Sequence, residues 1–442
     1  MEYNKQQITF DIVSDSQLSF NYLHPNKETK KLKVLSLFSG CGGMDLGFEG
    51  NFIAPLKSIA PRPEWIEKHI DNNWVLLKPT NFSLIFANDI LREASLTWTR
   101  FMERYGYDSS IYRTESIVDL VKQHKNGGNV FPNNVDVVIG GFPCQDFSVA
   151  GKRKGFNSMR SHDGKLRTNT IPTEESRGKL YYWMKEVIDI TKPKIFIAEN
   201  VKGLVNMGQV KDIIQADFSH ANGNGYIVLP PQVLHAGNYG VPESRERVFF
   251  IGIRKDALKK EVVQALESGQ ISTELYPYPK PTHNCTLNDE TLAGPVVLRD
   301  VLARLKEPKD SYDPSQRFYS RAKYMGAHCQ GQKEIVMDSI GPTIRSEHHG
   351  NIEFRRLAAE HGGNYKEELK KGAVERRLTP RECALIQTFP PDYQFVIPKN
   401  YSWNRFIVSA SGAYKVIGNA VPPVLAYHIA MRIQSLWSTY FK

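Results

Sequence analysis

The chain has 442 residues and a formal net charge of +10, with 57 Lys and Arg against 47 Asp and Glu. This excess of positive charge favours a polyanionic partner such as a nucleic acid, and the length allows roughly two or three domains. No apolar run approaches the ~18 residues that a membrane span needs, and the first residues lack a signal-peptide core. We therefore expect neither a membrane protein nor a secreted one.

The cysteines do not form a metal-binding or cross-linking pattern. They include no CxxC pair and their number is odd, so neither a zinc site nor a disulfide framework is indicated. We expect no bound metal and a reducing, cytoplasmic environment. The five are Cys41, Cys144, Cys285, Cys329 and Cys383.

The first predicted elements follow a polar N-terminal arm that ends near residue 31. Residues 34–48 combine an apolar strand, a glycine-rich turn and the start of an amphipathic helix. Glycines at such a turn let a ligand approach the backbone, and a helix N-terminus can face polar groups. The turn is not the GxGxxG dinucleotide fingerprint, and glycine-rich turns also occur where nothing binds.

A second strand is predicted at residues 82–87, and it ends at Asn88 and Asp89. A carboxylate at this place in a nucleotide-binding sheet commonly holds ribose hydroxyls, so Asp89 is a candidate for that contact. An insertion at residues 51–80 separates the two strands. Its composition indicates no function.

A third strand is predicted at residues 135–141, since this short, β-branched run closed by glycines is typical of a buried parallel strand. Cys144 follows it, where ligands bind in open α/β sheets. A lone cysteine is more often a small buried hydrophobe, but Gln145 and Ser148 make this setting polar. We therefore interpret Cys144 as a nucleophile.

A nucleophilic cysteine needs positive or hydrogen-bonding company, because a free thiol with a pKa of about 8.5 is mostly protonated at neutral pH. The following loop carries Lys152, Arg153, Lys154 and Arg160. Such a loop is suited to closing over a polyanion. The same composition also fits a solvated surface loop.

Charged residues stand at the ends of two later strands. A strand at residues 194–198 runs into Glu199, while Arg245 and Arg247 precede an apolar strand at 248–253. Taken singly, such residues most often face solvent. Their occurrence in this order after Cys144 supports one shared active site.

The rest of the chain has a different pattern. Residues 256–375 break into short strands punctuated by glycine and proline, whereas residues 422–438 return to the spacing of an amphipathic helix that should pack back on the first domain. The expected division is an N-terminal arm at 1–31, a catalytic α/β domain at 32–254, a second domain at 255–376 and C-terminal motifs at 377–442.

At this point the chain resembles a known family, the cytosine 5-methyltransferases that act on DNA with S-adenosylmethionine. The resemblance runs from about residue 32 to the C-terminus, and chance agreement of six motifs in family order is negligible. A single variable region and a compact length are similar to the bacterial modification enzymes of restriction systems. The motifs are LFSGCGG at 37–43, GFPCQDFS at 141–148, ENV at 199–201, RER at 245–247, RLTPRECALIQTFP at 377–390 and IGNAVPP at 417–423.

The resemblance implies a Rossmann-like methyltransferase domain and a second, smaller, mostly irregular or β target-recognition domain. It also implies the chemistry, in which Cys144 adds to carbon 6 of cytosine and carbon 5 then takes the methyl group. Glu199 would hydrogen-bond ring nitrogen 3 and the exocyclic amine, Arg247 the exocyclic oxygen, and Arg245 would support this arrangement. Glu243 stands where glutamine is common in the family, and could buttress Arg245 or be exposed.

For S-adenosylmethionine the resemblance places Phe38 against the adenine or sulfonium region and Asp89 on the ribose hydroxyls. Ser116 aligns with an aspartate that usually receives the adenine amine, so either the alignment slips there or a hydroxyl substitutes. The remaining residues implied around the cofactor are Ser39, Gly40, Cys41, Gly42, Gly43, Ile90, Pro143, Leu180 and Asn419.

For double-stranded DNA the resemblance implies that the target cytosine is flipped out of the duplex. The loop after Cys144 would close on the DNA, and its implied contacts are Gln145, Ser148, Lys152 and Arg177. Arg345 is the best single candidate for reading a base, because arginine can bond guanine with two hydrogen bonds. The basic residues that compete with it are Arg317, Arg321, Lys323, Arg355 and Arg356.

Three other interpretations remain open. A tRNA methyltransferase of this fold would be expected to have a shorter variable region with a CFT tripeptide, and no CFT occurs here. A catalytically inactive DNA-binding homologue should lack the Pro-Cys-Gln core around Cys144. A nicotinamide oxidoreductase would leave Cys144, Glu199 and Arg247 unexplained. We expect a monomer whose genetic partner is a restriction endonuclease.

Overall fold

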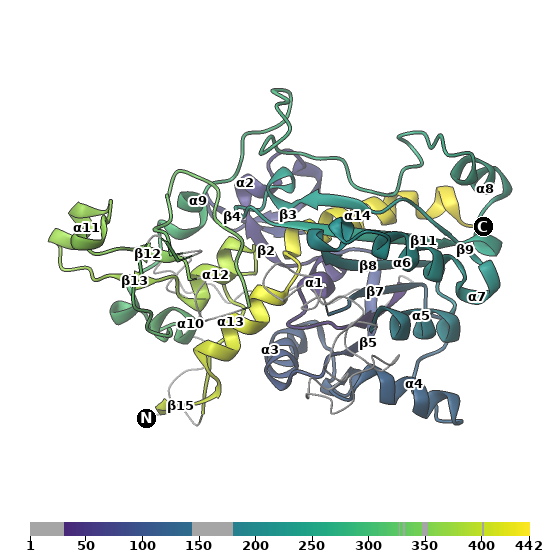
Figure 1. The fold of residues 1–442 in the computed structure, drawn as a ribbon, viewed down its shortest axis with the longest axis horizontal. Coiled ribbons are helices and arrows are strands. Elements are labelled where there is room, and N and C mark those ends of the chain that lie inside the picture. The colour runs from purple at the N-terminus through teal and green to yellow at the C-terminus, as the bar shows by residue number, and fades with distance from the viewer. Residues whose placement is uncertain (1–30, 144–179, 327, 330–331, 347–351, 400–401) are drawn as a thin grey trace.

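The computed structural model describes residues 31–143, 180–326, 328–329, 332–346, 352–399 and 402–442. A large α/β unit and a smaller, loop-rich unit lie side by side along the longest axis of the molecule (Figure 1). Cys144, Gln145, Ser148, Lys152 and Arg177 fall outside the described residues.

The large unit is built on an eight-stranded sheet with strand order β10-β11-β8-β7-β1-β5-β6, and β9 also pairs with β11. The neighbours from β8 to β6 are parallel, whereas β11 runs antiparallel to β8. The Rossmann-like α/β class predicted from the sequence is confirmed. The strands are β1 (Leu32–Leu37), β5 (Phe82–Asn88), β6 (Tyr112–Arg113), β7 (Val137–Gly141), β8 (Ile195–Val201), β9 (Tyr226–Val228), β10 (Gln232–His235) and β11 (Glu246–Arg254).

Two strands extend further than their apolar residues predict. β8 continues through Glu199 to Val201, and β11 begins at Glu246, so that Arg247 pairs with Val201. We expected Glu199 and Arg247 to flank these strands, and this was wrong because both lie within them. The reason is that the antiparallel ladder between β8 and β11 satisfies backbone groups at polar and apolar positions alike.

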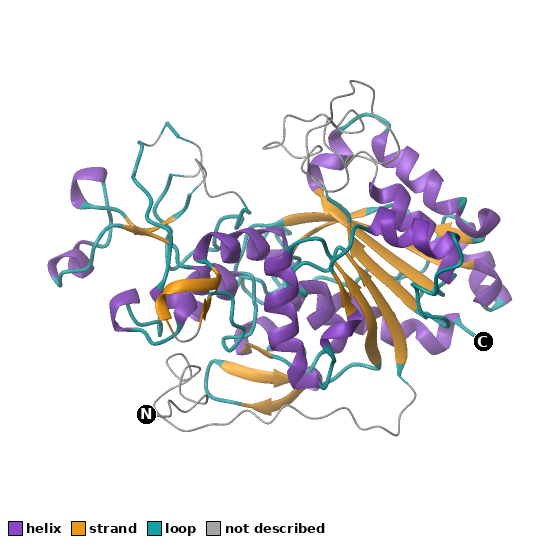
Figure 2. Ribbon diagram, turned by 90° about the horizontal axis from the view of Figure 1, so that it is seen from below, coloured by secondary structure: helices purple, strands orange, loops and turns teal. Residues whose placement is uncertain are grey.

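Helices cover both faces of the sheet, as Figure 2 shows. Alternate strand residues point to opposite faces, and the buried side chains divide accordingly. Ile139 and Ile197 belong to one hydrophobic cluster, while Val138 and Phe196 belong to another. The helices of this unit are α1 (Gly43–Glu49), α3 (Arg92–Met102), α4 (Ile117–Lys125), α5 (Leu180–Thr191), α6 (Val210–Ser219), α7 (Ala221–Asn224) and α8 (Lys260–Glu267), with α14 (Pro423–Tyr440) from the C-terminus.

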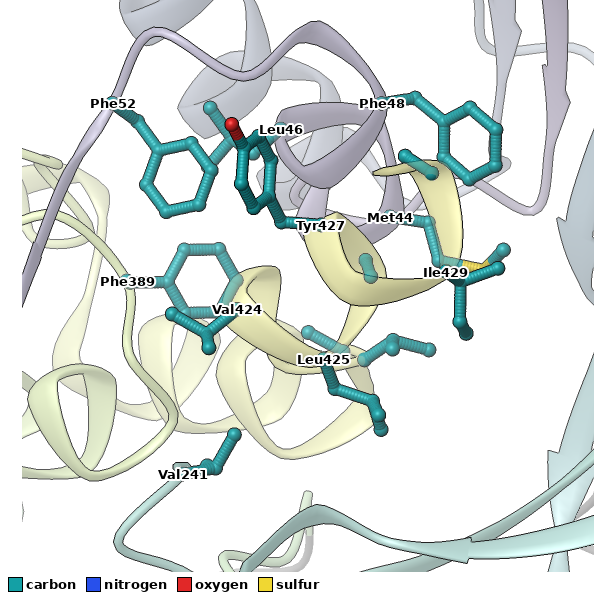
Figure 3. Packing of buried hydrophobic residues seen from close by; sticks show 14 of the residues in the cluster. Met44, Leu46, Phe48, Phe52, Val241, Phe389, Val424, Leu425, Tyr427 and Ile429 are labelled. Carbon is teal, nitrogen blue, oxygen red and sulfur yellow. The ribbon is translucent and has the colours of Figure 1, made fainter. Parts of the chain in front are cut away.

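The C-terminal helix α14 packs closely against α1. A Cβ added to Gly47 would lie 2.3 Å from the Cβ of Ala426, so the two helices can approach this closely only with glycine there. Around this contact, Phe52 meets Tyr427 with ring centroids 5.9 Å apart, and Figure 3 shows the apolar residues that surround it. The C-terminal helix α14 therefore completes the hydrophobic core around α1.

The insertion between β1 and β5 forms a small sheet over α14. Its strands are ordered β2-β4-β3. The ring of Trp65 lies 5.4 Å from that of Tyr427 and 4.8 Å from that of His428. The insertion thus covers the C-terminal helix. Its elements are β2 (Ile53–Pro55), α2 (Leu56–Ile59), β3 (Ile66–His69) and β4 (Trp74–Leu77).

The smaller unit has short elements held together by buried polar contacts. Arg376 pairs with Glu382 at 2.8 Å, and both side chains are almost fully buried. The side chains of Thr379 and Glu382 cap α12 reciprocally, which fixes the start of the 377–390 motif. The elements are α9 (Leu298–Leu302), α10 (Pro314–Arg317), β12 (Phe354–Arg356), α11 (Lys366–Lys370), β13 (Arg376–Arg377), α12 (Pro380–Ile386), β14 (Ile397–Lys399), β15 (Ser402–Val408) and α13 (Ala410–Asn419).

Among the described helices, none combines the length and the apolar character that crossing a bilayer requires.

Candidate active site

The candidate active site lies at the carboxyl ends of β7 and β8. Gly141 of β7 pairs with Glu199 of β8, and a Cβ on Gly141 would lie 2.6 Å from Oε2 of Glu199. The side-chain amide of Asn200 donates to the carbonyl of Phe142 at 3.1 Å. These contacts fix the chain two residues before Cys144, and they bring the Glu199 carboxyl close to that segment.

Glu199 and Arg247 form an ion pair on adjacent strands. Nε of Arg247 lies 2.9 Å from Oε1 of Glu199, and the two side chains are only 12% and 9% exposed. Burial raises the pKa of Glu199 above its ordinary value, while the neighbouring Arg247 and Arg245 oppose that rise. A carboxyl in this balance can be protonated closer to neutral pH than a solvated one, and can then donate a hydrogen bond.

Arg245 is also buried, but its hydrogen bonds go to the protein. Nη1 donates to the carbonyl of Ile344 at 2.9 Å, and Nη2 donates to the carbonyls of Gly418 and Ala420 at 2.9 and 2.7 Å. These are the contacts of a positioning residue. Glu243 is fully buried as well, which excludes an exposed carboxylate there.

The glycine-rich turn after β1 adopts backbone conformations that favour glycine. Gly40 and Gly42 have φ values of 55° and 81°, and Phe38 has 52°, which is unusual for a residue with a side chain. A Cβ on Gly42 would lie 2.7 Å from the Trp98 ring, whereas a Cβ on Gly40 would meet nothing within 4 Å. The turn therefore packs against Trp98 at Gly42, whereas at Gly40 it leaves room for a neighbouring group.

Asp89 fixes this turn from the end of β5. Its carboxylate accepts hydrogen bonds from the backbone of Gly40 at 3.1 Å and from that of Leu91 at 2.9 Å. The hydroxyl of Tyr112 donates to the carbonyl of Gly40 at 2.9 Å. An acidic side chain thus lies beside an open glycine turn, at the edge of the sheet where α/β proteins bind ligands.

A group of buried side chains beneath the turn was not predicted from the sequence. Asp45 accepts hydrogen bonds from Ser36 and from the Trp98 indole, both at 2.6 Å, and burial raises the pKa of Asp45 to about 7. Tyr393 donates to the carbonyl of Cys41 at 2.6 Å. Nothing local marks these positions, because Asp45 would be exposed on an ordinary surface helix. Only the packing of α3 and the C-terminal motifs on α1 buries them.

The other residues expected around the cofactor lie at different depths. Ser116 caps α4 by accepting from the backbone of Val118 at 3.3 Å. Cys41 is fully buried with its thiol toward the carbonyl of Val416, whereas Ile90 is 43% exposed. Asn419 is exposed at the end of α13. Four other residues expected around the cofactor also lie within the described part of the chain, namely Ser39, Gly43, Pro143 and Leu180.

The candidate DNA readers differ in their surroundings. Arg345 is partly buried, and its Nη1 is buried with no hydrogen-bond partner among the described residues. Arg356 is fully buried in ion pairs with Glu307 and Glu368, and Arg355 also pairs with Glu368. The exposed basic side chains among these candidates are Arg317, Arg321 and Lys323.

The sheet, the open glycine turn with Asp89, and the Glu199–Arg247 pair define a class, the Rossmann-like methyltransferases that use S-adenosyl-L-methionine. The model of the C-5 cytosine-specific DNA methylases matches residues 32–435. The chain therefore belongs to that family, and is a DNA cytosine-5-methyltransferase.

Among the described residues no group of three or more His, Cys, Asp or Glu side chains could hold a metal ion.

Individual relatives agree with the family assignment. The Type II methyltransferase M.BsuRI of Bacillus subtilis is 31% identical over 426 residues, which cover 94% of this chain and 82% of that protein. M.BspRI of Lysinibacillus sphaericus is 30% identical over 431 residues, covering 94% and 84%. The solved structure of the S. pombe Dnmt2 methyltransferase has the same fold, with a TM-score of 0.51 at 15% identity, covering 92% of this chain and 99% of that one.

Proposed function

We propose that this enzyme methylates carbon 5 of a cytosine flipped out of a specific duplex sequence, through a covalent adduct with Cys144. The observation that carries the proposal is the buried Glu199–Arg247 pair, 2.9 Å apart, beside the strand that leads to Cys144. Residues 255–376 supply the target recognition, in keeping with their loop-rich elements and exposed basic side chains.

Carbon 5 of cytosine is a poor nucleophile and must be activated before it can accept a methyl group. The thiolate of Cys144 forms a bond to carbon 6, while Glu199 donates a proton toward ring nitrogen 3 and so absorbs the developing charge. Arg247 donates to the exocyclic oxygen. When bound, S-adenosyl-L-methionine supplies an electrophilic methyl group on a sulfonium.

The second half of the reaction restores the aromatic ring. After carbon 5 has taken the methyl group, a base removes the proton from carbon 5 and the bond between carbon 6 and Cys144 breaks. The cofactor residues of this chain serve to orient that transfer. Asp89 would hold the ribose hydroxyls, and the open turn at Gly40 would receive the methionine portion, with Phe38 and Asn419 as the flanking contacts.

Flipping costs about a few kcal/mol in lost stacking and pairing. The basic loop after Cys144, with Lys152 and Arg177, offsets this cost by binding phosphates, and Gln145 and Ser148 contact the DNA where the base has left. The relatives named as Type II methyltransferases support a role as the modification enzyme of a restriction system. We also propose that the enzyme acts as a monomer and has an endonuclease as its genetic partner.

Covalent trapping tests this proposal. A duplex whose target cytosine carries fluorine at carbon 5 has no proton there to remove, so the adduct should persist and migrate as a protein–DNA species in a denaturing gel. Cys144→Ser should form no such species and transfer no labelled methyl group, yet still bind DNA. Turnover by Cys144→Ser, or labelling of tRNA in place of duplex DNA, would contradict the proposal.

A further inference from the structure

A buried ion pair joins the catalytic strand to the recognition region. Glu243 and Arg245 just precede β11, with Nη1 of Arg245 3.4 Å from Oε1 of Glu243, and both side chains are 0% exposed. Burial raises the pKa of Glu243, which Arg245 opposes. Burying two charges is costly unless hydrogen bonds satisfy them. The hydrogen bonds that this pair makes therefore indicate its structural role.

Both backbone groups of Ile344, in the recognition region, bind to this pair. The amide of Ile344 donates to Oε1 of Glu243 at 2.7 Å, and its carbonyl accepts from Nη1 of Arg245 at 2.9 Å. Beside it, the amide of Ser244 donates to the carbonyl of Gly341 at 2.7 Å, and the amide of Gly341 donates to Pro242 at 3.0 Å. Residues 341–344 are therefore fixed in register with residues 242–245.

The same guanidinium holds a third segment. Nη2 of Arg245 donates to the carbonyls of Gly418 and Ala420, which flank Asn419. A Cβ on Gly418 would lie 2.2 Å from the carbonyl carbon of Arg345, so the backbones of these two segments are in direct contact. One side chain thus links the recognition segment, the Asn419 turn and the catalytic strand.

We propose that Glu243 and Arg245 are positioning residues that hold the recognition segment (residues 341–346) in register with the catalytic Glu199–Arg247 pair, and thereby determine sequence discrimination. The inference rests on the proposed function, because it takes Glu199 and Arg247 as the groups that face the base. Arg247 is two residues from Arg245, so displacement of Arg245 moves the catalytic pair and the reader segment together.

The test uses the full-length enzyme and a duplex carrying the methylation site mapped by bisulfite sequencing of DNA from cells that express it. Binding is measured for this duplex and for its single-base variants, in the presence of S-adenosylhomocysteine, so that no chemistry contributes. Glu243→Ala removes the acceptor for Ile344, and should reduce discrimination by about tenfold or more. Glu243→Gln keeps an acceptor oxygen in place and should restore most of the discrimination.

Arg245→Lys serves if Glu243→Ala fails to fold. It keeps the positive charge, but one ammonium cannot reach all the oxygens that the guanidinium holds. It should reduce discrimination and also weaken S-adenosylhomocysteine binding through the Asn419 turn. The matched control is Glu382→Gln, in a buried Glu–Arg pair. Among the described residues the hydrogen bonds of Glu382 go to Arg376 and Thr379 rather than to either segment, and the variant should lower thermal stability without changing discrimination.

Unchanged discrimination in Glu243→Ala and Arg245→Lys, with only a lower melting temperature, would overturn the inference and leave the pair a purely stabilising one. Glu199→Gln separates this result from a failure of the proposed chemistry, since it should lower the methyl-transfer rate by about 100-fold or more while discrimination in binding persists. Discrimination lost equally in Glu382→Gln would likewise overturn the inference, because general loosening would then explain the effect.

Discussion

Glu199 combines burial with a close ion pair to Arg247, and this combination sets its proton affinity. The neutral carboxyl is favoured by the loss of water, and the charged one by Arg247 at 2.9 Å. Because burial is the larger effect, the pKa of Glu199 is raised. The protonated form, which can donate to the cytosine ring, therefore persists to higher pH than it would in a solvated glutamate.

The Glu199→Gln variant should lose methyl-transfer rate by about 100-fold or more, because it cannot deliver a proton in the transition state. Its affinity for S-adenosylmethionine should stay within about twofold, since no cofactor contact is removed. Single-turnover kinetics and cofactor binding measure the two effects. Glu246→Gln, which alters a more exposed carboxylate paired with Lys202, is the control and should keep the wild-type rate.

The pH dependence of the single-turnover rate gives a second test at this residue. The rate should fall as the pH rises through the raised pKa of Glu199, because the protonated carboxyl is then lost, and this fall should come above the usual range of a glutamate. In Glu199→Gln the falling limb should disappear. A falling limb that persists unchanged in the variant would assign it to another group.

Arg345 is carried by a backbone that Glu243 and Arg245 fix through Ile344. If it reads guanine, Arg345→Ala should lower affinity for the cognate duplex by about 1–3 kcal/mol and relax the preference at one base pair. Arg321→Ala, at an exposed position, should instead weaken binding to every duplex alike, as a phosphate contact does. Titrations of cognate and single-base-variant duplexes distinguish the two, and equal losses for Arg345→Ala would make it a phosphate contact.

At the scale of elements, the contact between α1 and α14 decides which residues α1 can contain. Helix propensity alone favours alanine over glycine by about 1 kcal/mol. Packing opposes it, because a Cβ on Gly47 would lie 2.5 Å from the carbonyl carbon of Ala426 and 2.6 Å from the amide nitrogen of Tyr427. Backbone atoms cannot rotate away from such an overlap, so the two helices would have to separate.

Gly47→Ala should therefore lower the free energy of unfolding by roughly 1–3 kcal/mol, opposite in sign to the propensity effect. Urea unfolding followed by circular dichroism measures the change. Gly294→Ala is the control, because a Cβ there would meet nothing within 4 Å, and it should change stability by less than about 0.5 kcal/mol. A stabilised Gly47→Ala enzyme would contradict the close helix contact.

At the scale of the whole molecule, His428 lies where distant parts of the chain meet. It belongs to α14, and its ring lies 4.8 Å from Trp65 of the insertion and 5.4 Å from Tyr239. Burial, with smaller contributions from His283 and Arg62, lowers the pKa of His428 to about 3. The imidazole is therefore neutral in the folded protein at any pH that the enzyme meets.

Because the unfolded chain binds a proton at this histidine below about pH 6.5 and the folded chain does not, stability should fall with acid from pH 6.5 towards pH 3. The loss should reach about 1.4 kcal/mol per pH unit from this group. Urea unfolding at pH 7 and pH 5 measures it. His428→Phe, which keeps a ring, should flatten this dependence, whereas His69→Gln at an exposed position should leave it unchanged.

The sequence alone determined those features of the fold and of the site that depend on the local pattern of residues. Apolar runs closed by glycines located β1 and β7, and an apolar run closed by Asn88 and Asp89 located β5, because strand burial and turn conformation act on consecutive residues. It likewise predicted Asp89 as the carboxylate at the end of the second strand, and Glu199 and Arg247 as parts of one shared active site. The family motifs added what those residues do, and they identified Cys144, whose surroundings lie outside the described structure.

Only the tertiary structure decided the contacts between segments far apart in the chain. Asp45 beneath the cofactor turn and Gly47 against Ala426 gave no local signal, since burial depends on what packs over a residue. For Glu243 the sequence left two alternatives, a buttress for Arg245 or an exposed carboxylate, and the buried pair in the structure decided between them. Arg245 and Arg247 belong to the same short motif, yet Arg245 binds backbone carbonyls whereas Arg247 pairs with Glu199. The physical reason is that secondary structure follows neighbouring residues, whereas a side chain's partners follow the path of the whole chain.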